Sequence, residues 1–289
     1  MTTFIQLVVA GLTIGVIYGI IGVAFVVLHR VSGILNFAIP DLIMVAAIGS
    51  VYLPERHDFP RFVAIVGVVV VLAVIGYLFE RFFLTPAVNR GSGLIHLLLL
   101  TFALSIALRG LALISFGRDT YSAPPLIGGE PFMILGASVQ RQSLLFVLIG
   151  LVAAGGLALF FRSTVYGKAM SATASNQRGA WLVGINPGQM RRVAFVASVV
   201  VSALVGIVLI SVIPFEYTTA QVGFWGLVAA AVVGLDRPQR ALVAGVAIGV
   251  LQLLLARYIS ASFQTAIAYT ALIVLLLVRP QLTSVKVSR

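Results

Sequence analysis

Long apolar runs separated by short polar stretches make up most of this chain. A helix needs about 20 residues to cross a hydrocarbon core of roughly 30 Å. Nine runs approach that length, at about 4–28, 33–53, 62–80, 94–117, 143–161, 193–213, 223–235, 241–257 and 262–278. The seventh run is short, which favours a half-helix, so eight to ten crossings fit the pattern. The pattern predicts an all-α polytopic membrane protein with about nine transmembrane helices, some of them broken or short.

Composition supports a membrane protein rather than a soluble one. The chain is 61% hydrophobic and only 9% charged, whereas soluble domains carry about 25% charged residues. The net charge of +11 does not indicate nucleic-acid binding, because the basic residues lie singly between apolar runs. There is no cysteine and the three histidines are far apart, so no metal site is expected. No polar region is large enough for a second domain, and we expect one transmembrane domain over residues 1–289.

The distribution of Lys and Arg predicts the orientation. With the N-terminus outside, 13 basic residues fall in inside regions and 5 in outside regions, while Arg109 lies within a span. Cytoplasmic loops of membrane proteins carry an excess of Lys and Arg. We therefore expect the N-terminus outside and the C-terminus in the cytoplasm.

The longest inside loop, residues 162–192, has a helical pattern of small and apolar residues. Gly184 suits the end of a helix, and Asn186 followed by Pro187 suits the start of the next one. The pattern predicts a short helix beneath the membrane. Such a helix can dock into a groove on a partner protein or rest on anionic lipid, and spacing alone does not separate these interpretations.

The start of the second span carries a proline beside an acid. Pro40 lacks an N–H, and within a helix its ring would clash with the carbonyl of Asn36. We therefore expect the span to kink or break between these residues. Broken helices are common at solute sites, and Asp41 next to the break favours a place in a solute pathway. A simple kink satisfied by neighbouring groups is the alternative.

Asp41 and Arg109 are the charges expected deep within predicted spans. Each is about eight residues from one end of its span, or about 12 Å along a helix. Asp41 is counted from the inner end of its span and Arg109 from the outer end. In a core of roughly 30 Å this leaves about 6 Å between them along the membrane normal, which an arginine side chain can bridge. Buried charges in membranes usually pair or line a cavity. The prediction is that Asp41 and Arg109 pair, or that Arg109 faces an aqueous cavity, either for solute passage or only for helix packing.

Glycines at four-residue spacing predict close helix packing. They occur in the first span and in the eighth, as Gly11, Gly15, Gly19, Gly245 and Gly249. Contact with another subunit is the second interpretation.

Several segments resemble the permeases of branched-chain amino-acid ABC importers, in particular the shorter permease subunit. In the inside loop, a G-x-A-x-x-A…A…GI pattern is matched by Gly167, Ala169, Ala172, Asn176, Ala180, Gly184 and Ile185. At the second span a G-x-x-NFAHGD pattern is matched at Asn36, Phe37, Ala38 and Asp41, with Ile39 and Pro40 differing. Weaker matches are Gly234–Pro238 and the ending Val278-Arg279-Pro280.

The resemblance implies a coupling helix that binds an ATPase subunit. Its implied contacts are Gly167, Lys168, Ala169, Ala172, Asn176, Arg178, Ala180, Gly184 and Ile185. The predicted translocation pathway joins the matched residues Asn36, Phe37 and Asp41 to Pro40 and Arg109, which the helix break and the intramembrane charges indicate. The implied partners are a second permease in a heterodimer, two cytoplasmic ATPases that hold ATP and magnesium, and a periplasmic solute-binding protein. The implied place is the bacterial inner membrane, and the implied solutes are branched-chain amino acids or similar small polar molecules.

Other function classes find less support. No G-x-x-x-x-G-K-[ST] motif occurs, so we expect neither a cofactor on this chain nor enzymatic activity of its own. An ion-coupled secondary transporter would need intramembrane acids or histidines, and only Asp41 qualifies. A passive channel would need a selectivity-filter motif, and none is recognisable.

Overall fold

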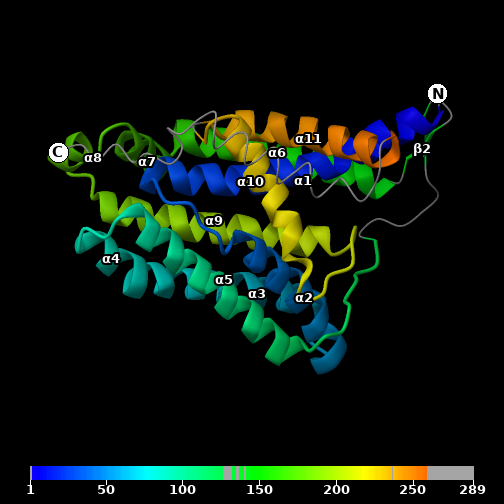
Figure 1. The fold of residues 1–289 in the computed structure, drawn as a ribbon, viewed down its shortest axis with the longest axis horizontal. Coiled ribbons are helices and arrows are strands. Elements are labelled where there is room, and N and C mark those ends of the chain that lie inside the picture. The colour runs from blue at the N-terminus through cyan, green and yellow to red at the C-terminus, as the bar shows by residue number, and fades with distance from the viewer. Residues whose placement is uncertain (1, 126–131, 135–136, 140, 236, 259–289) are drawn as a thin grey trace. The chain divides into compact units, whose positions relative to one another are not determined.

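The part of the protein that the structure describes is almost entirely helical (Figure 1). The structure is a computed structural model that describes residues 2–125, 132–134, 137–139, 141–235 and 237–258. Its elements, in chain order, are α1 (Thr2–Ser32), α2 (Ile39–His57), α3 (Arg61–Phe79), the π-helix η1 (Glu80–Leu84), α4 (Thr85–Asn89), α5 (Leu94–Phe116), β1 (Phe132–Ile134), β2 (Ala137–Val139), α6 (Arg141–Ser163), α7 (Val165–Ser175), α8 (Gln177–Leu182), α9 (Pro187–Leu209), the 3₁₀ helix η2 (Thr219–Gln221), α10 (Val222–Val232) and α11 (Pro238–Tyr258). The two strands pair as a small antiparallel hairpin, with Met133 opposite Ser138.

Five segments within the described residues are helical, long and apolar enough to cross a membrane. They are Phe4–Ser32, Arg61–Asn89, Leu94–Phe116, Pro187–Leu209 and Pro238–Tyr258. The short helix α10 matches the seventh predicted run, which was expected to be a half-helix. The ninth predicted run, 262–278, lies outside the described residues. The chain is therefore an all-α multi-pass membrane protein.

The chain forms two compact units of non-contiguous segments. Unit 1 comprises Met1–Val26, Pro125–Gly155 and Phe224–Arg289, and unit 2 comprises Val27–Pro124 and Gly156–Gly223.

Unit 2 is built around α9, which packs against α2 and α3 (Figure 1). Gly206 of α9 lies against α2, where an added methyl group would come within 3.1 Å of the Ala47 backbone nitrogen. Gly76 of α3 lies against α9, where a methyl group would come within 2.9 Å of Val199 Cγ2. Small residues thus allow these backbones to approach closely, although the sequence analysis did not identify either glycine.

In unit 1, the glycines of α1 face those of α11. A methyl group on Gly11 would lie 2.6 Å from Cα of Val250, and one on Gly15 would lie 2.6 Å from Cα of Val246. Gly245 and Gly249 lie directly against the backbone of Gly19 and Gly15. The glycines predicted to pack helices therefore meet one another in this unit.

The second span begins later than predicted. The sequence pattern placed it at 33–53, with Pro40 inside the helix, but α2 begins at Ile39 and Pro40 lies in its first turn. A proline is tolerated there because the N–H it lacks would have no helical partner. Residues 34–36 form no helix, so the chain breaks before Pro40 instead of kinking at it.

Candidate functional site

The broken segment between α1 and α2 is held inside unit 2 by hydrogen bonds from side chains. Asn36 is fully buried, and its Oδ1 accepts a hydrogen bond from the Ala38 amide at 3.0 Å. The Thr101 hydroxyl of α5 lies 3.3 Å from the Phe37 amide nitrogen, which donates to it, and 3.2 Å from the Leu35 carbonyl oxygen. These bonds satisfy backbone N–H and C=O groups that have no partner within a helix. Inside a membrane such groups must find a hydrogen-bond partner within the protein.

One polar group of the Asn36 side chain has no partner among the described residues. This group is the amide Nδ2, which is buried. A buried polar group without a partner is costly, so this donor is available to a water molecule or a solute at the break.

Asp41 projects from the first turn of α2 into a cluster on α5. Arg109 Nε donates to Asp41 Oδ1 at 3.1 Å, and Arg109 Nη2 lies 3.1 Å from the same oxygen. Ser105, one helical turn before Arg109, donates to the other carboxylate oxygen. The predicted pairing of Asp41 with Arg109 is confirmed. The pair forms because the first turn of α2 faces α5. The prediction had instead relied on the depths of the two residues within continuous helices.

The two members of the pair differ in exposure. The Asp41 side chain is 1% exposed, whereas that of Arg109 is 46% exposed. Phe102 and Ile106, on the same face of α5, are also exposed. A charged side chain facing lipid at mid-membrane costs about 2.5–3.5 kcal/mol. Arg109 is therefore best accommodated where its face of α5 lines a polar cavity or contacts another protein.

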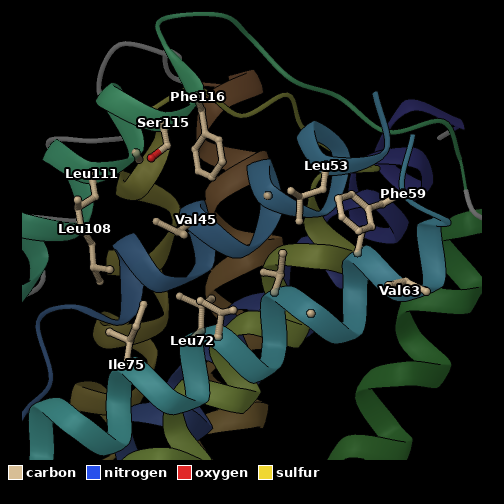
Figure 2. Close-up of a pocket in the computed structure, with 16 residues that line it drawn as sticks. Val45, Leu53, Phe59, Val63, Leu72, Ile75, Leu108, Leu111, Ser115 and Phe116 are labelled. Atoms are coloured by element: carbon tan, nitrogen blue, oxygen red, sulfur yellow. The ribbon is translucent and has the colours of Figure 1, made fainter. Parts of the chain in front are cut away.

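A separate hollow lies among α2, α3 and α5, with a volume of about 420 Å³ (Figure 2). Its walls include Val45, Leu72, Leu108 and Phe116, and Ser115 is the one polar residue in its lining. No charged side chain lines it, and neither Asp41 nor Arg109 takes part. The hollow therefore lacks groups that would bind the charged ends of an amino acid.

The inside loop forms two helices instead of the single helix predicted. Helix α7 ends at Ser175, and Asn176 takes an extended conformation with φ −156° and ψ 106°. The side chain of Asn176 accepts a hydrogen bond from the Gly179 amide at 2.9 Å, which caps the new helix α8. An asparagine in extended conformation is a favoured N-cap, so this residue divides the segment.

The turn after α8 follows the prediction. Gly184 has φ +85°, and its amide donates to the Trp181 carbonyl while the Ile185 amide donates to the Ala180 carbonyl. This is the Schellman arrangement, which favours glycine at that position. Asn186 then caps α9 by accepting from the Gln189 amide at 3.2 Å.

The resulting segment, Val165–Ile185, which we call the coupling segment after its predicted role, has a packed side and an open side. Gly167, Met170, Thr173 and Ala180 are buried, and a methyl group on Gly167 would come within 2.6 Å of Cα of Phe161 at the end of α6. Trp181, Leu182 and Val183 are instead 69%, 77% and 74% exposed. Gly167 and Ala180 thus serve internal packing, while the three other residues, which were not among the predicted contacts, form an exposed apolar surface.

The other predicted contacts lie between these extremes. Asn176 and Arg178 are exposed, whereas Ala169, Ala172 and Ile185 have intermediate exposure on the same segment. The predicted coupling residues thus lie in one segment. The predicted pathway residues Asn36, Phe37, Pro40 and Asp41 lie at one break, and Arg109 contacts Asp41 there.

These features define a helical, multi-pass membrane protein with a buried carboxylate paired to a half-exposed arginine beside a broken helix, and with a capped helical segment in one loop. The chain belongs to the family described as the branched-chain amino acid transport system permease component, whose model matches residues 7–278. This membership does not favour the secondary-transporter interpretation.

Individual relatives agree over nearly the whole length. The high-affinity branched-chain amino acid transport system permease protein LivH of Salmonella typhimurium is 24% identical, over 96% of this chain and 94% of its own. The corresponding protein BraD of Pseudomonas aeruginosa is 25% identical over the same shares. Among solved structures, PsaBC from Streptococcus pneumoniae in complex with Fab has a TM-score of 0.50 at 15% identity, covering 97% of this chain and 94% of that one. The last likeness concerns the fold alone.

Proposed function

We propose that this chain is the transmembrane permease subunit of an ATP-binding-cassette importer in the bacterial inner membrane. Its solutes are branched-chain amino acids or similar small polar molecules, as the names of LivH and BraD indicate for those relatives. The observation that carries the proposal is the family match over residues 7–278. The chain supplies a passage and no ATPase site, and ATP with magnesium binds the partner subunits.

The proposed pathway passes the break before α2. Two features support this place: the unused Nδ2 donor of buried Asn36 and the half-exposed guanidinium of Arg109, which Asp41 holds in position. Phe37 and Pro40 are the other proposed pathway residues at this break. Groups with fixed orientation at a broken helix suit the binding of a zwitterion during its passage.

The proposed contact with the ATPase is the coupling segment Val165–Ile185. Its support is the exposed apolar surface of Trp181, Leu182 and Val183, on a segment that also carries the exposed basic residues Lys168 and Arg178. Exposed apolar side chains gathered at one turn commonly mark a protein contact. The assembly proposed around it has a second, related permease, two ATPases and a periplasmic solute-binding protein.

The proposed topology has about nine crossings, with the N-terminus outside and the C-terminus inside. Its support is the excess of basic residues in the loops assigned to the cytoplasm. In this orientation the coupling segment faces the cytoplasm and the hairpin β1–β2 faces outward.

The test is reconstitution of the full transporter in vesicles with the Leu182→Glu variant. Leu182 is 77% exposed, so the charge leaves the permease fold intact but opposes docking, by more than about 2 kcal/mol if the site is a binding hot spot. We expect the ATPase subunits to be lost on purification and vanadate-sensitive uptake to stop.

Met133→Glu is the matched control, because Met133 is 75% exposed on the hairpin. This variant keeps its ATPase subunits. Normal ATPase retention and uptake in Leu182→Glu, or a wild-type complex that never retains an ATPase, would contradict the proposal.

A further inference from the structure

Glu80 is a buried carboxylate that the pathway and the exposed apolar surface do not use. It opens the π-helix η1 and is 0% exposed. Within the described residues, Asp41 and Glu80 are the two carboxylates that are buried. An unpaired buried charge is strongly destabilising, so the groups around Glu80 indicate why the charge is kept.

Two adjacent arginines of α9 bind the two oxygens of this carboxylate. Arg191 Nε donates to Oε1 at 3.1 Å, and Arg192 Nε donates to Oε2 at 2.8 Å. Thr85 donates to Oε1 at 2.8 Å and accepts from Arg191 Nη2 at 3.0 Å. The Arg191 and Arg192 side chains are only 12% and 26% exposed, so salt and water weaken these bonds little.

The helix that carries Glu80 is widened at this point. The Thr85 amide donates to the Glu80 carbonyl, five residues back, and Pro86 follows directly. A proline ring clashes with the carbonyl four residues before it, and a π-turn relieves that clash. Single π-turns within α-helices are frequent at functional sites.

The arginines lie where the coupling segment joins the membrane helices. They follow the Gly184 turn and the Asn186 cap and lie in the second turn of α9. The body of α9 packs closely on α2 and α3. The Glu80 cluster therefore ties the inner end of α9 to α3, beside the segment that meets the ATPase in the proposed function.

We propose that Glu80 is a positioning residue that clamps the start of α9 to α3 and so transmits movement of the coupling segment to the membrane helices. Without the clamp, the turn at Gly184 and the start of α9 absorb the displacement. This inference rests on the proposed function, since it needs an ATPase that moves the segment.

The test compares Glu80→Gln with the wild type in the complete reconstituted transporter. The readout is solute molecules taken up per ATP hydrolysed, because loss of folded protein lowers both quantities together and leaves their ratio unchanged. We expect ATPase subunits to remain bound while the ratio falls on the order of tenfold, the usual size of a coupling interaction. Glu55→Gln, which removes an exposed carboxylate at the end of α2, keeps the wild-type ratio.

Arg191→Gln and Arg192→Gln cover the case in which Glu80→Gln does not fold. Each leaves Glu80 with one arginine, and each is expected to lower the ratio by a smaller factor. A wild-type ratio in the folded variants would overturn the clamp but leave the proposed function standing. A wild-type complex that neither retains nor stimulates an ATPase would instead overturn the proposed function, and the clamp with it.

Discussion

Asp41 shows how a single carboxylate is accommodated inside the membrane part of this protein. Ser105 and Arg109, one turn apart on α5, donate to its two oxygens. The positive end of the α2 dipole also favours a negative charge in the first turn. These groups hold the Asp41 carboxyl group in place and, in turn, fix Arg109, whose side chain remains half exposed.

We expect Asp41→Asn to lower both stability and uptake, because it leaves Arg109 without its counter-charge. The loss of stability is about 2 kcal/mol, below the 3–5 kcal/mol of a fully buried pair because Arg109 is partly exposed. The double variant Asp41→Asn/Arg109→Gln regains most of the stability but not the uptake. Thermal unfolding in detergent and vesicle uptake of each variant measure the two effects. Full uptake in the double variant would show that the pair serves only helix packing.

At the scale of helices, glycine spacing and capping residues decide how the elements meet and where they end. In unit 1, Gly15 of α1 leaves no room for a side chain, since a methyl group would lie 2.6 Å from Cα of Val246. Asn176, Gly184 and Asn186 set the limits of α8 and α9 through their caps and turns. The Gly184 turn and the Asn186 cap were readable from the sequence because they depend on residues within one or two turns, whereas the Asn176 cap was not predicted.

We expect Gly15→Leu to separate α1 from α11 and to lower the yield and melting temperature of the protein. Overpacking typically costs about 1–3 kcal/mol, and more where backbones touch. Gly67→Leu is the control, because a Cβ at Gly67 meets no atom within 4 Å. Size-exclusion profiles after heating compare the two, and equal stability would show that the glycine contact contributes little.

At the scale of the whole molecule, the proposed orientation in the membrane rests on the distribution of basic residues between spans. The absence of cysteine makes it measurable, since any introduced cysteine is the only thiol. Ser175 in the coupling segment and Glu55 at the end of α2 are both exposed. They lie on opposite sides of the membrane in the proposed topology.

We expect a membrane-impermeant maleimide to label Glu55→Cys in intact spheroplasts and Ser175→Cys only in inverted vesicles. The reason is the positive-inside distribution of Lys and Arg. Labelling of Ser175→Cys from outside would reverse the topology and remove the coupling segment from the reach of any cytoplasmic ATPase.

The sequence by itself determined the class of the protein, because apolar runs of membrane-spanning length and a low charge content depend on composition alone. It also located the glycines that pack α1 against α11, the Gly184 turn and the Asn186 cap. Only the tertiary structure decided that the second span begins at Ile39, that Ser105 and Thr101 support the break, and that Glu80 is buried against Arg191 and Arg192. These contacts join residues 64 to 112 positions apart, and local periodicity carries no information about which helix faces which.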